Sequence, residues 1–173
     1  MEQLTLNKIK AFLTELGQRY PTPDTLFLLG GSALCLLGSP RPTLDLDYVG
    51  NDLQPNDLQQ ILHQVANDLH VEVEAVPIAQ FVPLPVGVDS RKLWVGQFGY
   101  LTVYIFDPYT IALSKIDRGF DSDIEDVIFL IRQQFITFKQ LEIVTLTALE
   151  QAHAFDLSPI AMRAHLQAVR QQM

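Results

Sequence analysis

The chain has 173 residues, of which 48% are hydrophobic, and a formal net charge of −8. This length is enough for the core of one domain, and the negative charge argues against a protein that binds polyanions through a broad basic surface. The single cysteine, Cys35, excludes an internal disulfide, and no segment reaches the roughly 18 apolar residues of a membrane span. Because the N-terminus has no apolar targeting segment, we expect a cytoplasmic protein that makes no membrane contact.

The first half of the chain alternates helix and strand signals. Apolar residues at helical spacing from Leu6 to Leu16 predict an amphipathic helix that ends before Pro21. The elements predicted next are a strand at 25–29, a short helix at 32–37, a loop at 39–43, a strand at 44–49, a helix from about 55 to 69 and a strand at 71–76.

The second half begins with a segment at 77–99 that contains several prolines and glycines and is predicted to be mostly loop, with a short strand around Trp94. A strand at 101–106 follows, and Asp107-Pro108 predicts a capped helix through Lys115. Further helices are predicted at about 122–134, 137–152 and 159–171. This order predicts an α/β (α+β) fold, a small mixed sheet backed by helices, with one domain at 1–135 and a helical extension at 136–173 packed on it.

Gly30, Gly31 and Ser32 lie between a predicted strand and a predicted helix. Glycines at such a turn let the backbone approach a ligand closely, and the free amides that begin the helix point toward an anion such as a phosphate. Ser32 would add a hydroxyl donor. Glycines also occur at strand-to-helix turns for steric reasons alone, so this motif by itself leaves both interpretations open.

Asp45 and Asp47 lie two residues apart on a predicted strand. Their side chains should therefore project to the same face, about 6 to 7 Å apart. Like charges at this separation resist joint ionisation unless a cation lies between them, and carboxylate oxygens suit Mg²⁺ or Mn²⁺. The alternative is a solvated edge strand whose aspartates cap a turn.

The combination is more specific than either part. Gly30-Gly31-Ser32, twelve intervening residues and then Asp45-Leu46-Asp47-Tyr48 resembles the signature of the nucleotidyltransferase superfamily related to DNA polymerase β. Within it, the chain looks most like bacterial stand-alone proteins of the abortive-infection and toxin–antitoxin type. The resemblance implies that Gly30, Gly31 and Ser32 bind the nucleoside triphosphate and that Asp45 and Asp47 are catalytic metal ligands.

A second segment is similar to those toxin-like members, with Lys115 and Arg118 on one helix and Asp123 and Asp126 at the start of the next. The resemblance implies that Lys115, a solvated lysine, steadies the phosphates. Asp123 and Asp126, neighbours on one helical face, would complete the acidic site or orient Lys115, so Lys115 and Asp123 are counted as catalytic. For Arg118 and Asp126, a surface salt-bridge cluster is an open alternative.

A third carboxylate is also expected, because polymerase-like enzymes use one as a base or a second-metal ligand. The candidates are Glu72 and Glu74, which share a strand face, Asp107, which is also explained as a helix cap, and Asp123 or Asp126. The sequence leaves the choice among them open.

The remaining polar and aromatic residues are interpreted as structural. The four histidines, at positions 63, 70, 153 and 165, show no paired ligand spacing for zinc. Trp94, Phe98 and Tyr100 could stack on a base, but core packing is favoured.

The resemblance implies a Mg²⁺- or Mn²⁺-dependent enzyme that moves a nucleoside monophosphate from a nucleoside triphosphate to the hydroxyl of an RNA end or a protein. It also allows a cognate antitoxin. Two alternatives stay open. One is a non-catalytic nucleotide-binding or protein-interaction module of the same fold. The other is a metal-dependent nuclease, although the Gly-Gly-Ser motif before the aspartates favours a triphosphate as substrate.

Overall fold

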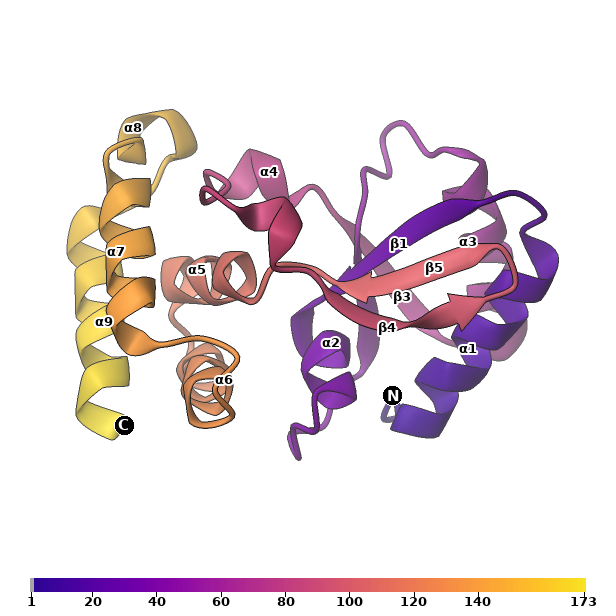
Figure 1. Cartoon of the computed structure of the whole chain (residues 1–173), viewed down its shortest axis with the longest axis horizontal. Coiled ribbons are helices and arrows are strands. Elements are labelled where there is room, and N and C mark those ends of the chain that lie inside the picture. The colour runs from indigo at the N-terminus through magenta and orange to yellow at the C-terminus, as the bar shows by residue number, and fades with distance from the viewer. Residues whose placement is uncertain (1) are drawn as a thin grey trace. The chain divides into compact units, whose positions relative to one another are not determined.

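The computed structural model describes residues 2–173 and confirms the mixed α/β fold with a helical C-terminal part (Figure 1). In chain order its elements are α1 (Leu6–Arg19), β1 (Asp24–Leu29), α2 (Gly30–Leu36), β2 (Asp45–Val49), α3 (Asp57–Leu69), β3 (Glu72–Val76), α4 (Ile78–Phe81), the 3-10 helix η1 (Val88–Ser90), β4 (Leu93–Phe98), β5 (Leu101–Ile105), α5 (Pro108–Arg118), α6 (Asp121–Arg132), α7 (Phe138–Leu149), α8 (Ala152–Phe155) and α9 (Pro159–Gln172). None of the helices in these residues is both long and apolar enough to cross a membrane.

The contacts divide the chain into two compact units. The sheet unit comprises the residues up to Pro77 together with Leu93–Phe106, and it holds all five strands and α1 to α3. The helical unit comprises Ile78–Lys92 and Asp107–Met173. Compact units need not fold independently, so the domain boundary expected at residue 135 stays a prediction.

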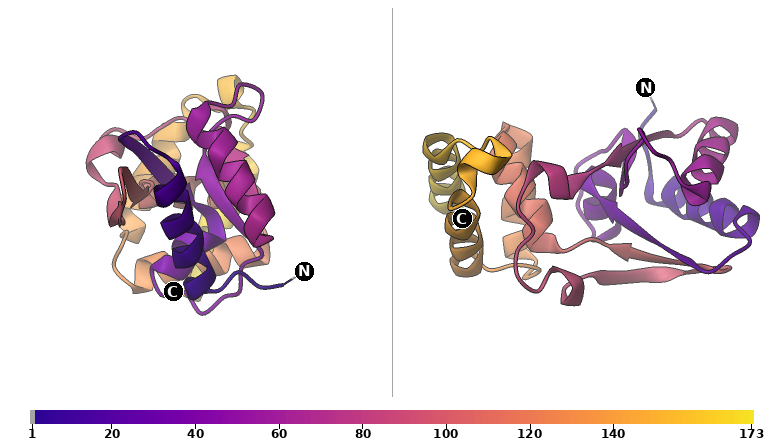
Figure 2. Two further views of the ribbon diagram at one scale, coloured as in Figure 1. Left: turned by 90° about the vertical axis from the view of Figure 1, so that its right-hand side faces the viewer. Right: turned by 90° about the horizontal axis from the view of Figure 1, so that it is seen from above.

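The sheet has the strand order β3-β2-β1-β5-β4. The pairs β1–β5 and β2–β3 are parallel, whereas β1–β2 and β4–β5 are antiparallel. Helices α1 and α3 pack together on one face of the sheet (Figure 2), which we call the helix-covered face. Leu28, Leu46 and Tyr48 are buried there. Because strand residues alternate, their neighbours in sequence lie on the opposite face.

Local sequence explains where several helices begin. The Thr5 hydroxyl caps α1 by accepting from the amide of Lys8. Asn56 and Gln59 form a reciprocal capping box at the start of α3. Asp107 caps α5, with Pro108 in its first turn. Each cap satisfies amides that have no partner inside the helix.

The segment at 77–99, predicted to be mostly loop, contains α4, η1 and the six-residue strand β4. Strand β4 pairs with β5 and contains a bulge, because Trp94 lies opposite Tyr104 while Gly96 lies opposite Val103. The prediction underestimated the length of β4, because an extra residue interrupts the alternation of apolar and polar residues by which a strand is recognised in sequence.

In the helical unit, α5 packs against α6, α7 and α9. The single helix predicted at about 137–152 is instead two, α7 and the short α8. The break begins where the amides of Glu150 and Gln151 bond three residues back, to Thr147 and Ala148. Bonds of this kind tighten the last turn of a helix and end it.

A candidate metal and nucleotide site

The orientation of β2 is set by Tyr48. Its hydroxyl lies 3.4 Å from the Gln59 side-chain nitrogen and 3.4 Å from His63 Nε2, both on α3. Burial raises the pKa of Tyr48. Because Tyr48 faces α3, Asp45 and Asp47 point to the opposite face of the sheet, where both are half-buried.

A third carboxylate joins them from β3. The parallel pairing of the two strands places Glu74 opposite Asp47 and Glu72 opposite Asp45. Carboxylate oxygens of Asp45, Asp47 and Glu74 all lie within 4.8 Å of one another, and Glu74 is exposed. Among residues 2–173, these three side chains form the one group of this size with ligand atoms so close. We call it the carboxylate cluster.

Gly30 lies directly against this cluster. Its neighbour Leu29 pairs with Asp47, and Gly30 has a positive φ of 71°. A Cβ atom at Gly30 would collide with the Asp47 carboxylate, and one at Gly31 would come within 2.7 Å of Thr43 Oγ1. Glycine is therefore needed here both for the backbone conformation and for the close approach of β2.

Ser32 is fully buried, and its hydroxyl donates to the carbonyl of Leu29 at 3.3 Å. The helix α2 begins at Gly30, two residues earlier than predicted. The hydroxyl thus closes the turn between β1 and α2. The turn is held in place by Ser32 and kept narrow by Gly30 and Gly31.

Lys115 and Asp123 belong to the helical unit, where they form an ion cluster with Arg118 and Asp126. The Lys115 amine donates to Asp126 at 2.8 Å and lies 3.6 Å from Asp123, which also accepts from Arg118 at 2.5 Å. Lys115 is 3% exposed and Asp126 1%. The expectation of a solvated Lys115 was wrong, and the alternative of a surface position does not hold for Asp126, because the packing of α5 on α6 covers both.

Asp107, another candidate for the third carboxylate, is fully buried with both oxygens engaged. Arg91, which the sequence did not single out, donates to each oxygen at 2.7 Å. The Asp107 carboxylate also accepts from the amides of Tyr109 and Thr110 and from the Thr110 hydroxyl. The hydrogen bonds with Arg91 and with the first turn of α5 thus give Asp107 a structural role.

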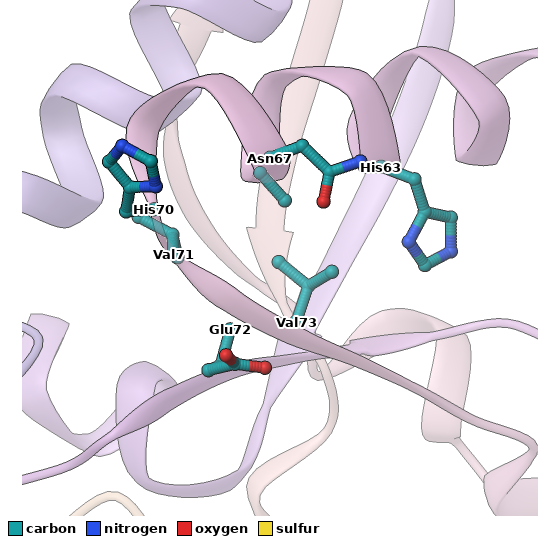
Figure 3. Close-up of a pocket in the computed structure, with 7 residues that line it drawn as sticks. His63, Asn67, His70, Val71, Glu72 and Val73 are labelled. Carbon is teal, nitrogen blue, oxygen red and sulfur yellow. The ribbon is translucent and has the colours of Figure 1, made fainter. Parts of the chain in front are cut away.

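A polar hollow of about 300 Å³ lies beside α3 and β3, lined by His63, His70, Asn67 and Glu72 among others (Figure 3). Figure 3 shows the imidazole rings of His63 and His70 at opposite ends of the hollow, so they do not converge on one ion. His63 lies 3.2 Å from Asp52, and His70 ends α3 with a positive φ of 53°. Both positions agree with structural roles.

The preference for core packing of Trp94 and Tyr100 was wrong. Trp94 is 67% exposed and Tyr100 61%, whereas Phe98 is half-buried. For Trp94 the bulge is the physical reason, because it puts Trp94 and Phe98 on different faces although their positions differ by four. Tyr100 lies in the turn between β4 and β5.

Comparison with known proteins identifies the family. A family model described as "Nucleotidyltransferase of unknown function (DUF6036)" matches residues 4–162, a range that contains both the carboxylate cluster and the ion cluster. No curated protein and no solved structure matches the chain. The narrower resemblance to abortive-infection and toxin–antitoxin proteins stays a prediction. Since the match covers most of its length, the chain belongs to this family of nucleotidyltransferases.

Proposed function

We propose that the chain is a divalent-metal-dependent nucleotidyltransferase that transfers a nucleoside monophosphate from a nucleoside triphosphate to an acceptor hydroxyl. The observation that carries the proposal is the carboxylate cluster, in which Asp45 and Asp47 are joined by Glu74. The family match supports the general reaction.

The residues of the cluster fit a hard divalent cation. They offer only carboxylate oxygens, which Mg²⁺ and Mn²⁺ prefer, and they bring three negative charges within 4.8 Å of one another. Such a concentration of like charge is unfavourable without a cation. Asp45, Asp47 and Glu74 would hold the ion, which when bound neutralises phosphate charge and makes a nearby hydroxyl more acidic.

The turn after β1 would receive the triphosphate. Gly30 touches the Asp47 carboxylate, so a phosphate approaching the backbone at Gly30 and Gly31 would lie beside the cluster. Ser32 would hold this turn in shape through its bond to Leu29 rather than by contacting a phosphate. Because Gly30 and Gly31 have no side chains, the substrate would have room to approach the backbone here.

Lys115 and Asp123 are proposed as positioning residues. Their charges are already matched within the ion cluster, and a buried lysine that serves two carboxylates has few donors left for a phosphate. They would support the reaction by keeping α5 and α6 together.

The third carboxylate favours an enzyme over the non-catalytic module. The sequence left the third carboxylate open, and Glu74 lies opposite Asp47 with an oxygen close to those of Asp45 and Asp47. The acceptor, an RNA end or a protein, and a cognate antitoxin stay predictions.

The test is transfer of label from each α-labelled nucleoside triphosphate to total RNA or protein with Mg²⁺. We expect Asp45→Asn and Glu74→Gln each to lower the rate by about a hundredfold or more. Glu72→Gln is the matched control, because Glu72 lies on the same strand and face but outside the cluster. No transfer from any triphosphate, or a Glu74→Gln rate equal to that of Glu72→Gln, would contradict the proposal.

A further inference from the structure

Three aromatic side chains lie in one row across the sheet. Phe27 on β1 is opposite Tyr104 on β5, which is opposite Trp94 on β4. These strands run side by side in Figure 1. The Phe27 and Tyr104 rings are stacked with centroids 5.9 Å apart. Phe27 follows the buried Leu26 and precedes the buried Leu28, so the row lies on the face away from α1 and α3.

The row continues the face that carries the carboxylate cluster. On β1, Leu29 lies opposite Asp47 of β2. Phe27 is two residues before Leu29, so its side chain is on the same face as that of Asp47. Neighbouring strands are about 4.8 Å apart and the row is displaced by two residues along them, which puts Trp94, three strands from β2, about 16 Å from Asp47. One face thus holds acidic ligands at one side and aromatic rings at the other.

Trp94 is placed in the row by the β4 bulge. Without the extra residue, Trp94 and Phe98 would share a face, and Trp94 could be buried under α1 as Phe98 partly is. Instead, Trp94 is 67% exposed. Bulges are over-represented next to active sites, where they re-aim a side chain.

The composition of this part of the sheet is compatible with a base as the ligand. The stretch Leu93–Phe106, which supplies Trp94 and Tyr104, contains no charged residue although the chain has a net charge of −8. No carboxylate of this stretch would repel a phosphate backbone. Uncharged rings bind bases of any sequence through stacking.

We propose that the aromatic row of Phe27, Tyr104 and Trp94 is a stacking platform for unpaired bases near the end of a nucleic-acid acceptor strand. The proposal rests on the proposed function, since it names RNA as the acceptor at the same site. Trp94 is too far from the cluster for the base of a triphosphate whose α-phosphate lies there. It suits the bases that precede a terminal hydroxyl placed at the cluster.

The test uses Trp94 itself, because it is the single tryptophan of the chain and its fluorescence reports on its surroundings directly. A single-stranded RNA octamer of mixed sequence should quench the emission in a saturable manner. An octamer with abasic sites at its last positions has the same phosphates and should quench much less. Nucleoside triphosphate with Mg²⁺ should leave the emission nearly unchanged.

Variants separate stacking from charge attraction. Trp94→Ala should weaken binding of end-labelled RNA, measured by anisotropy, by about five- to a hundredfold. Tyr100→Ala is the matched control, because this equally exposed aromatic residue lies outside the row, and it should bind as the wild type does. Both variants should keep the wild-type melting temperature.

Each outcome decides the proposal. Equal quenching by abasic RNA, equal RNA binding by both variants, strong quenching by the triphosphate alone, or label transfer only to protein would overturn the platform. Saturable quenching without any nucleotide transfer would uphold the platform while contradicting the proposed enzymatic function.

Discussion

The carboxylate cluster and the ion cluster are two groups of acidic side chains with opposite surroundings. In the carboxylate cluster, three carboxylates lie within 4.8 Å of one another, and their side chains are half-buried or exposed. In the ion cluster, Asp123 and Asp126 are 1% exposed and are bonded to Lys115 and Arg118. The sequence left open whether Asp123 and Asp126 complete the acidic site or orient Lys115.

The difference shows which group is suited to a ligand. A buried ion pair is tolerated only when its charges are matched and its hydrogen bonds are made, so such a group serves the fold. Carboxylates that gather near solvent disfavour joint ionisation unless a cation lies between them, so such a group is better suited to a ligand. The surroundings of an acid, more than its spacing in sequence, indicate its role.

The largest expected effect is on the ion cluster. Lys115→Met leaves two buried carboxylates without their ammonium, which should lower the free energy of unfolding by about 3 to 5 kcal/mol. For a domain of this size, the melting temperature should fall by about 6 to 20 °C. Lys139→Met, at an exposed position of α7, is the control and should have little effect. Similar melting of the two variants would show that Lys115 does not stabilise the fold.

An intermediate effect is expected at the carboxylate cluster, where a ligand rather than a side chain should supply the stability. Mg²⁺ and a nucleoside triphosphate, at about a hundred times their dissociation constant, should stabilise the protein by about 2.7 kcal/mol. The melting temperature should then rise by about 5 to 10 °C. The double variant Asp45→Asn, Asp47→Asn should melt no lower than the metal-free wild type, because it also removes repulsion. It should lose the ligand-induced rise. A rise that persists in this variant would place the metal elsewhere.

The smallest effect concerns Asp117, an acid of α5 next to the ion cluster in sequence. Burial raises its pKa, as does Asp156, against the opposing effects of His165 and Arg118. The folded protein therefore keeps a proton that the unfolded chain loses near pH 3.9, so stability falls as pH rises through the raised pKa. Asp117→Asn should remove this slope and should melt no lower than the wild type at neutral pH.

Thermal melts between about pH 4 and pH 7 measure this slope, with the exposed Asp121→Asn as control. A slope that is unchanged in Asp117→Asn, or lost equally in Asp121→Asn, would show that Asp117 is not the group responsible.

Local patterns predicted most of the elements that lie around the site. Caps, apolar spacing and prolines act within a few residues, which is why α1, α3, α5 and the strands β1, β2, β3 and β5 lie near their predicted positions. The shared face of Asp45 and Asp47 also follows from local geometry. These features require no knowledge of distant partners.

Features that depend on distant partners were not predictable in the same way. The register of β3 on β2 puts both Glu72 and Glu74 opposite an aspartate, so Glu74 could be placed in the carboxylate cluster only from the side-chain positions. The burial of Lys115 depends on how α6 packs, and the exposure of Trp94 depends on the bulge against β5. Periodicity carries no information about these tertiary choices.

The parallel pairing of β2 with β3 through α3 has a consequence for how the protein folds. Asp45, Asp47 and Glu74 all come from one strand–helix–strand crossover, a short stretch of chain. Bringing the three acids together therefore requires only that this one crossover closes. They need no contact with β4 or β5 to meet, so we expect a substitution on either strand to leave the carboxylate cluster assembled.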